Sequence, residues 1–150
     1  MSAIKIYTDG SCKPNPGVGG FAVVVTYDGD KVMELSGSDE STTNNRMELS
    51  AMIIAVRILK EDRDAFIYSD SKYVVNSINR GYKRNKNKDL WELFDEAAAE
   101  TDCIISYKWV KGHAGNKHNE RADELAQQAA NQLKQKMKER DNGKIDKDDE

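Results

Sequence analysis

The first third of the chain alternates β-branched runs with turn residues, and this pattern constrains the fold more than any other feature. Residues 3–8 and 20–27 are typical of strands, and residues 28–30 (DGD) form a hairpin turn into a third strand over 31–36. Successive strands joined by a tight turn pair antiparallel. The chain is therefore predicted to begin as an antiparallel meander.

Helices and strands then alternate. A polar loop is predicted over 37–41, followed by a mostly buried helix over 43–60, which is too apolar for a surface helix and is capped by Thr43 or Asn44. Further strands are predicted at 65–69 and 103–110, helices at 72–79 and 90–100, and a last helix from a capping Asn119 to about Met137. The later crossovers favour parallel neighbours, so we expect an α/β fold with a mixed five-stranded sheet, its first three strands antiparallel, and helices on both faces.

Length and composition fit one domain with a charged end. The 150 residues can bury a real core, but residues 134–150 have almost no apolar side chains and mix both signs of charge. We therefore predict a domain over 1–133 and a disordered tail over 134–150. Cys12 and Cys103 lie far apart, and neither a signal peptide nor a membrane span is evident, so a cytoplasmic protein is expected.

Four acids lie where predicted element boundaries bring side chains to an edge. Asp9 ends the first strand, Asp70 ends the fourth, Glu48 lies in the buried helix, and Asp123 lies one turn into the last helix. Each has an ordinary structural explanation as a turn residue or helix acid. If they meet, however, four carboxylates cannot all stay ionised without cations, and oxygen ligands select Mg²⁺ or Mn²⁺.

Four sequence segments, YTDGSC…NPG, TTNNRMEL, SDSKYV and WVKGHAG…NERADELA, occur in an order and spacing that resembles ribonuclease H type 1, over Ile4 to about Ala130. The resemblance implies the mixed sheet and cleavage of the RNA strand of RNA/DNA hybrids with two divalent metals, Mg²⁺ or alternatively Mn²⁺, leaving 5′-phosphate and 3′-hydroxyl ends. It also implies that Asp9, Glu48, Asp70 and Asp123 are the metal ligands, with Asp9 bridging both ions.

The resemblance assigns further roles residue by residue. His113 corresponds to a flexible-loop histidine that assists proton transfer or product release, whereas His118 has no counterpart. Contacts to the hybrid, including a DNA-phosphate pocket at Thr43 and Asn87, are implied for a set of rim residues. These are Cys12, Asn15, Thr43, Asn44, Asn45 and Asn87. Ser41 and Lys72 replace a frequent arginine and a frequent glutamine of the family, which leaves their contacts open.

The segment from Arg80 to Trp91 departs from many bacterial relatives, because it lacks most of a basic protrusion that cradles the hybrid. Within it, residues 80–88 hold five basic residues and no acid, and this run is expected to bind phosphates, in particular through Lys83, Arg84 and Lys86. Trp91 either packs in the core or lines the DNA channel. The protein is expected to be a monomer.

Three other classes of protein compete with this interpretation. The first is a non-catalytic nucleic-acid-binding module of the same fold, against which the presence of all four acids together with His113 argues; the net charge of −3 is a further mild argument against a dedicated binder. The second is a haloacid-dehalogenase-type phosphatase. That class needs an aspartate two residues after its nucleophile, but Ser11 occupies this position after Asp9. The third is a related resolvase or integrase, against which the TTNNRMEL segment favours hybrid specificity.

Overall fold

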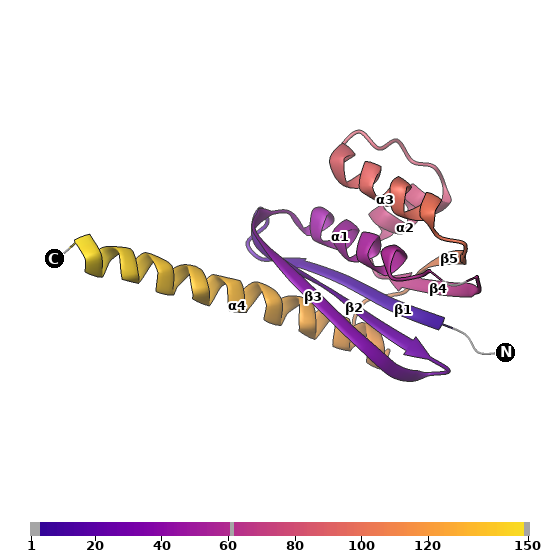
Figure 1. The fold of residues 1–150 in the computed structure, drawn as a ribbon, viewed down its shortest axis with the longest axis horizontal. Helices are drawn as coiled ribbons and strands as arrows, with labels where there is room; N and C mark the ends of the chain where they lie inside the picture. Colours follow the sequence, from indigo (N-terminus) through magenta and orange to yellow (C-terminus); the bar gives the residue numbers. More distant parts are fainter. Residues whose placement is uncertain (1–3, 61, 149–150) are drawn as a thin grey trace.

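A computed structural model of the protein describes residues 4–60 and 62–148. Its centre is a five-stranded sheet with the order β3-β2-β1-β4-β5 (Figure 1). The first three strands pair antiparallel, whereas β4 is parallel to β1 and β5 is parallel to β4. The strands are β1 (Ile4–Cys12), β2 (Gly17–Tyr27), β3 (Asp30–Thr42), β4 (Asp64–Ser69) and β5 (Ile104–Trp109). The predicted mixed sheet is confirmed.

Helices cover both faces of the sheet, as predicted (Figure 1). The helices are α1 (Asn44–Arg57), α2 (Lys72–Asn79), α3 (Lys88–Glu100) and α4 (Lys117–Asp148). Two glycines allow helices to approach closely. A Cβ at Gly10 of β1 would collide with the α1 backbone at Glu48, and one at Gly20 of β2 would collide with α4. In the described part of the chain, no helix is long and apolar enough to cross a membrane.

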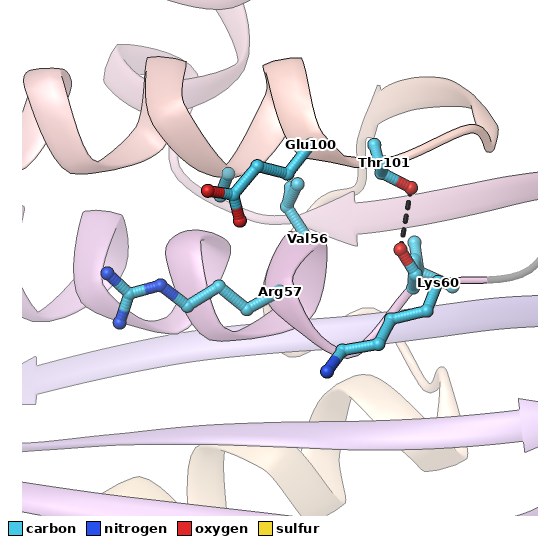
Figure 2. Close-up of a pocket in the computed structure, with 7 residues that line it drawn as sticks. Val56, Arg57, Lys60, Glu100 and Thr101 are labelled. Atoms are coloured by element: carbon cyan, nitrogen blue, oxygen red, sulfur yellow. Dashed lines mark hydrogen bonds between the residues drawn. The ribbon is translucent and has the colours of Figure 1, made fainter.

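The α1 and α3 helices pack side by side, and a hollow of about 420 Å³ lies between their C-terminal ends (Figure 2). The hydroxyl of Thr101 donates a hydrogen bond of 2.6 Å to the backbone oxygen of Leu59 there. The hollow is at the opposite end of α1 from Glu48. The hollow therefore lies between the ends of two packed helices and is not part of the acidic site.

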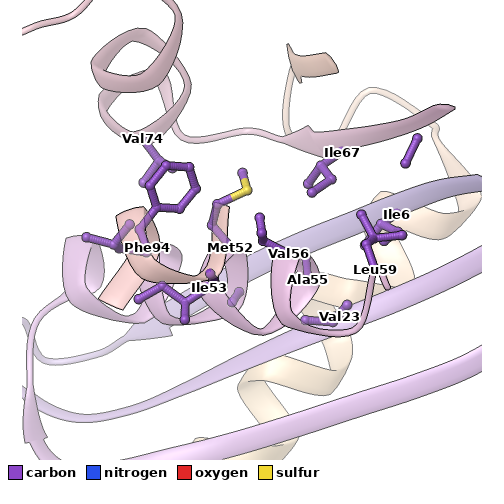
Figure 3. Close-up of a cluster of buried hydrophobic side chains, with 14 of the residues drawn as sticks. Ile6, Val23, Met52, Ile53, Ala55, Val56, Leu59, Ile67, Val74 and Phe94 are labelled. Carbon is purple, nitrogen blue, oxygen red and sulfur yellow. The ribbon is translucent and has the colours of Figure 1, made fainter. Parts of the chain in front are cut away.

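The main hydrophobic core lies between the sheet and the layer of α1, α2 and α3 (Figure 3). Ile6 and Ile67 from the sheet meet Met52 of α1 and Val74 of α2 there. Trp91 is only 2 % exposed and belongs to this core, which decides between the two positions that the sequence leaves open. The smaller cluster of Tyr7, Val24 and Ala122 packs under α4 on the other face.

Several predicted boundaries in the sheet are wrong, and two of them bear on the acids and on the third strand. The first strand does not stop at Asp9, because Asp9–Cys12 continue to pair with residues 19–22 of β2 across the Asp-Gly turn signal. Likewise, residues 37–41 are not a loop but extend β3, since they pair with β2. The parallel neighbour β4 pairs with β1 only as far as Thr8. Asp9 is therefore the first residue of β1 beyond the end of β4.

The last helix also differs from the prediction at both ends. It begins at Lys117, and its cap is Asn116 instead of Asn119, because Oδ1 of Asn116 accepts hydrogen bonds of 3.0 Å from the backbone N–H groups of His118 and Asn119. It continues as one helix to Asp148 instead of ending near Met137. The division into a domain over 1–133 and a separate tail over 134–150 stays a prediction.

Candidate active site

Three of the predicted acids meet at one edge of the sheet. Asp9 is the first residue of β1 past the end of β4, Asp70 follows β4 directly, and Glu48 lies in the second turn of α1. Gly10 has no side chain, so the α1 backbone can press against β1 at Glu48. One carboxylate oxygen from each acid lies within 4.8 Å of the others. We call these three residues the carboxylate cluster.

The carboxylate cluster is unfavourable for three negative charges. Burial raises the pKa of Asp9 to about 8, and the charges of Asp70 and Asp123 add to that effect. Burial and the charge of Asp9 also raise the pKa of Glu48 well above its usual range, and burial followed by the charge of Asp123 raises that of Asp70. Among the described residues, the buried Oε2 of Glu48 has no hydrogen-bond partner. An all-oxygen donor set with an orphaned buried oxygen fits a hard divalent cation.

Asp123 lies near the carboxylate cluster but is not one of the three acids whose oxygens all lie within 4.8 Å of one another. It is half-buried on α4, where Nε2 of Gln127, one turn further on, donates a hydrogen bond of 3.0 Å to its Oδ2. Its charge raises the pKa of both Asp9 and Asp70, which places it close enough to repel them. Its predicted role as a ligand stays a prediction.

The loop between β5 and α4 lies against the carboxylate cluster at Asp70. The N–H of Val110 donates to the backbone oxygen of Ser69, and a Cβ at Gly112 would lie 2.8 Å from Oδ2 of Asp70. His113 is exposed with φ of 57°, and its charge lowers the pKa of Asp70, although less than the burial and Asp123 raise it. The predicted proton carrier is therefore beside Asp70.

The predicted hybrid-contacting residues gather in one groove of about 470 Å³, which we call the amide groove. It is lined by Cys12, Asn15, Pro16, Thr43, Asn44, Asn45, Lys86 and Asn87. Oδ1 of Asn15 accepts a hydrogen bond of 3.1 Å from the backbone of Asn44, and Thr43 caps α1 by accepting one from Arg46. The cap is thus Thr43, one of the two candidates.

A hydrogen-bond network supports one wall of the amide groove. Asn87 has a left-handed backbone conformation with φ of 60°. Its Nδ2 donates a hydrogen bond of 3.1 Å to the hydroxyl of Tyr73. Arg46 donates a hydrogen bond of 3.4 Å to Oδ1 of Asn87. It also forms an ion pair of 2.7 Å with Asp89 and lowers the pKa of that carboxyl to about 2. Sequence reasoning missed Arg46, Tyr73 and Asp89, because their role depends on contacts between distant segments and leaves no local pattern.

The three predicted basic contacts lie in different surroundings. Lys86 lines the amide groove, and Lys83 is exposed outside it. The guanidinium of Arg84 lies 4.3 Å from the ring centre of Trp91 and forms an ion pair of 2.7 Å with Asp95. Arg84 therefore packs onto α3, and its contact with phosphate stays a prediction.

Lys72 and His118 have contacts of their own. The ammonium of Lys72 lies 4.9 Å from the ring centre of Trp109. Nε1 of Trp109 in turn donates a hydrogen bond of 3.0 Å to the backbone oxygen of Asp70. Trp109 is 44 % exposed beside the carboxylate cluster, and sequence reasoning missed it among the apolar residues of β5. The ring of His118 packs at a tilt against that of Tyr7, with 5.3 Å between the ring centres, and its Nε2 lies 3.3 Å from the backbone oxygen of Gly29, which is a structural role.

The mixed sheet, with carboxylates gathered where β1 passes β4, defines an α/β domain with an acidic nuclease-type site. A comparison with known families matches residues 1–131 to RNase H. The chain is also 46 % identical over 141 residues to the ribonuclease H of Francisella philomiragia and to that of Francisella tularensis subsp. novicida, covering 85 % of this chain and 90 % of each relative. The chain belongs to the RNase H family, and it is a ribonuclease H-type enzyme.

Solved structures agree with this assignment. The N-terminal RNase H domain of a Mycobacterium tuberculosis protein, solved as a fusion with maltose-binding protein, is 29 % identical with a TM-score of 0.73 and covers 91 % of this chain and 99 % of that one. LC11-RNase H1, solved in complex with an RNA/DNA hybrid, is 27 % identical with a TM-score of 0.71 and covers 87 % of this chain and 98 % of that one.

Proposed function

We propose that this protein is an endonuclease that hydrolyses the RNA strand of RNA/DNA hybrids and leaves 5′-phosphate and 3′-hydroxyl ends. The observation that carries the proposal is the carboxylate cluster, three acids within 4.8 Å, next to the amide groove. Both are built on the end of β1 and the start of α1: Asp9 lies three residues before Cys12, and Thr43 lies five residues before Glu48. A substrate held in the amide groove would pass the cluster.

The carboxylates have the role of holding cations. Asp9, Glu48 and Asp70, with Asp123 beside them, would hold two Mg²⁺ ions, for which Mn²⁺ could substitute. When bound, such ions lower the pKa of an attacking water and stabilise the leaving oxygen at phosphorus. Cation binding also removes the repulsion between the acids and supplies a partner for the orphaned Oε2 of Glu48.

The remaining residues bind substrate and move protons. Amide side chains both donate and accept hydrogen bonds, so Asn15, Asn44 and Asn45 are suited to the 2′-hydroxyls and base edges of a minor groove. Thr43 and Asn87 would hold a phosphate of the DNA strand. His113, exposed beside Asp70, would exchange a proton with solvent at the reacting phosphate.

Labelled RNA/DNA hybrid, duplex RNA and duplex DNA, each incubated with the protein and Mg²⁺, test the proposal. We expect only the RNA strand of the hybrid to be cut, at internal positions, with 5′-phosphate product ends. Cutting of duplex or branched DNA would indicate a resolvase or integrase instead. Binding of the hybrid without any cleavage would indicate a non-catalytic module.

A further inference from the structure

A basic segment of α4 lies against the loop that forms one end of the amide groove. Residues 134–140 (KQKMKER) hold four basic residues and one acid, in a chain with a net charge of −3. The Nζ of Lys134 donates a hydrogen bond of 2.5 Å to the backbone oxygen of Lys13. Lys13 lies between Cys12 and Asn15 in sequence, and both of those residues line the amide groove.

The basic residues of this segment face two sides of the helix. Lys136 lies beside Ser36 and Ser38 of β3, and Arg140 forms an ion pair of 2.7 Å with Glu40 at the end of the same strand. Lys134 and Lys138 are one turn apart on the other side, toward the loop between β1 and β2. Figure 1 shows α4 continuing past the sheet at the end where this loop lies.

The side that faces the loop carries excess positive charge. Lys13 and Lys138 are exposed, and within residues 4–60 and 62–148 no ion pair joins Lys13, Lys134 or Lys138 to an acid. The acid of the segment, Glu139, accepts a hydrogen bond of 3.3 Å from Gln135 along the helix itself. Lys13 and Lys134 therefore lie together at the groove end, Lys138 follows one turn further along α4, and among the described residues none of the three has an acidic ion-pair partner.

We propose that Lys13, Lys134 and Lys138 form a second phosphate-binding surface, which extends the grip on the hybrid beyond the amide groove. This inference rests on the proposed function, because the duplex must already lie in the groove. At 1.5 Å per residue, Lys134 and Lys138 are about 6 Å apart along α4, which corresponds to about two base pairs at 3.4 Å each. Contiguity with the groove favours phosphates of the same duplex as the ligand.

The test measures binding of hybrids of different length by the full-length chain with Asp70→Asn, which prevents cleavage, in Mg²⁺. One hybrid ends at the amide groove, and two others are lengthened by about six base pairs at one end or the other. The Lys134→Gln/Lys138→Gln double variant is compared with the parent and with Lys136→Gln, a matched change on the β3 side of the same helix segment. Thermal melting confirms that all three proteins fold alike.

We expect the double variant to bind one of the lengthened hybrids more weakly, by roughly eight-fold per lost contact at 0.1 M salt, and to flatten its log K against log[salt] slope by about one to two units. The short hybrid and Lys136→Gln should show no such change. Equal effects on all hybrids, equal effects of Lys136→Gln, or unchanged slopes would each overturn the proposal. Cleavage of hybrid by the unmodified protein tests the proposed function separately.

Discussion

The carboxylate cluster and the amide groove are neighbours on β1 and α1, but their polar groups differ in whether they have partners. In the cluster, Asp9 and Glu48 are 3 % and 4 % exposed, repel each other, and leave the buried Oε2 of Glu48 without a partner among the described residues. In the groove, Asn15, Thr43 and Asn87 each make a hydrogen bond to a neighbouring group before any ligand arrives.

This difference indicates what each region needs. A buried charge without a partner is costly, so the cluster is stable only when a cation or protons offset its charge. The groove is held in shape by the bonds among Arg46, Asn87, Asp89 and Tyr73, so its polar groups are positioned in advance. Mutations in the cluster should therefore change chemistry and metal response, whereas mutations in the groove should change affinity.

The largest effect is expected from Asp70→Asn, which should remove nearly all cleavage of hybrid in Mg²⁺. The change removes one anionic ligand of the cluster while keeping the size of the side chain. Initial rates with labelled hybrid measure it. Asp95→Asn makes the same chemical change at an acid with a 61 % exposed side chain on α3 and should cleave normally. Wild-type rates in Asp70→Asn would refute the assignment of the site.

A smaller loss is expected at His113, because the carboxylates still hold the metals when the proton carrier is gone. His113→Asn should slow turnover by about 10²-fold. Asparagine is chosen because it tolerates the left-handed backbone at φ of 57°, so a loss of activity would not reflect strain. Single-turnover rates measure the effect. Complete inactivity of a folded variant would mean that the role of His113 is misassigned.

In the amide groove, Asn87 offers a matched pair of substitutions. Both Asn87→Gly and Asn87→Ala remove the side chain expected to bind phosphate, so both should weaken hybrid binding by about ten-fold. Both variants lose the hydrogen bonds of Asn87 with Tyr73 and Arg46, but only alanine is strained at φ of 60°, so Asn87→Ala should be about 1 kcal/mol less stable than Asn87→Gly. Binding and urea unfolding separate the two effects. Unchanged affinity in Asn87→Gly would exclude the phosphate contact.

The smallest effects distinguish two basic residues near the groove. Lys86→Gln should weaken hybrid binding several-fold and flatten its salt slope by ~0.9, because Lys86 lines the groove. Arg84→Gln should mainly reduce stability, by about 1 kcal/mol, because its guanidinium stacks on Trp91 and pairs with Asp95. A larger salt-slope change in Arg84→Gln than in Lys86→Gln would reverse this assignment.

The sequence was sufficient where local pattern and tertiary context agree. The α2 helix has the predicted bounds, since Ser71 caps it and the chain leaves the helix at Arg80 before Gly81. The meander was also predictable from its β-branched runs. The sequence failed at Asp9 and at residues 37–41, because pairing with β2 overrides turn signals that are only local preferences.

The site was predictable in its carboxylates and less so in its supports. Asp9, Glu48 and Asp70 lie at boundaries or in costly places that a sequence reveals, and the structure brings them together. Arg46, Tyr73 and Trp109 act through contacts 14 to 43 residues away in sequence, which leave no local signature.

The melting temperature of the wild-type protein and of Asp70→Asn, each in EDTA and in Mg²⁺, tests the central claim most directly. In EDTA we expect Asp70→Asn to melt above the wild type, because repulsion within the cluster is relieved. Mg²⁺ at 100 times its Kd should stabilise the wild type by about 2.7 kcal/mol, or about 5–10 °C, and the variant much less. A wild-type melting temperature that does not change with Mg²⁺, together with an Asp70→Asn variant that melts below the wild type in EDTA, would contradict a metal site at this cluster.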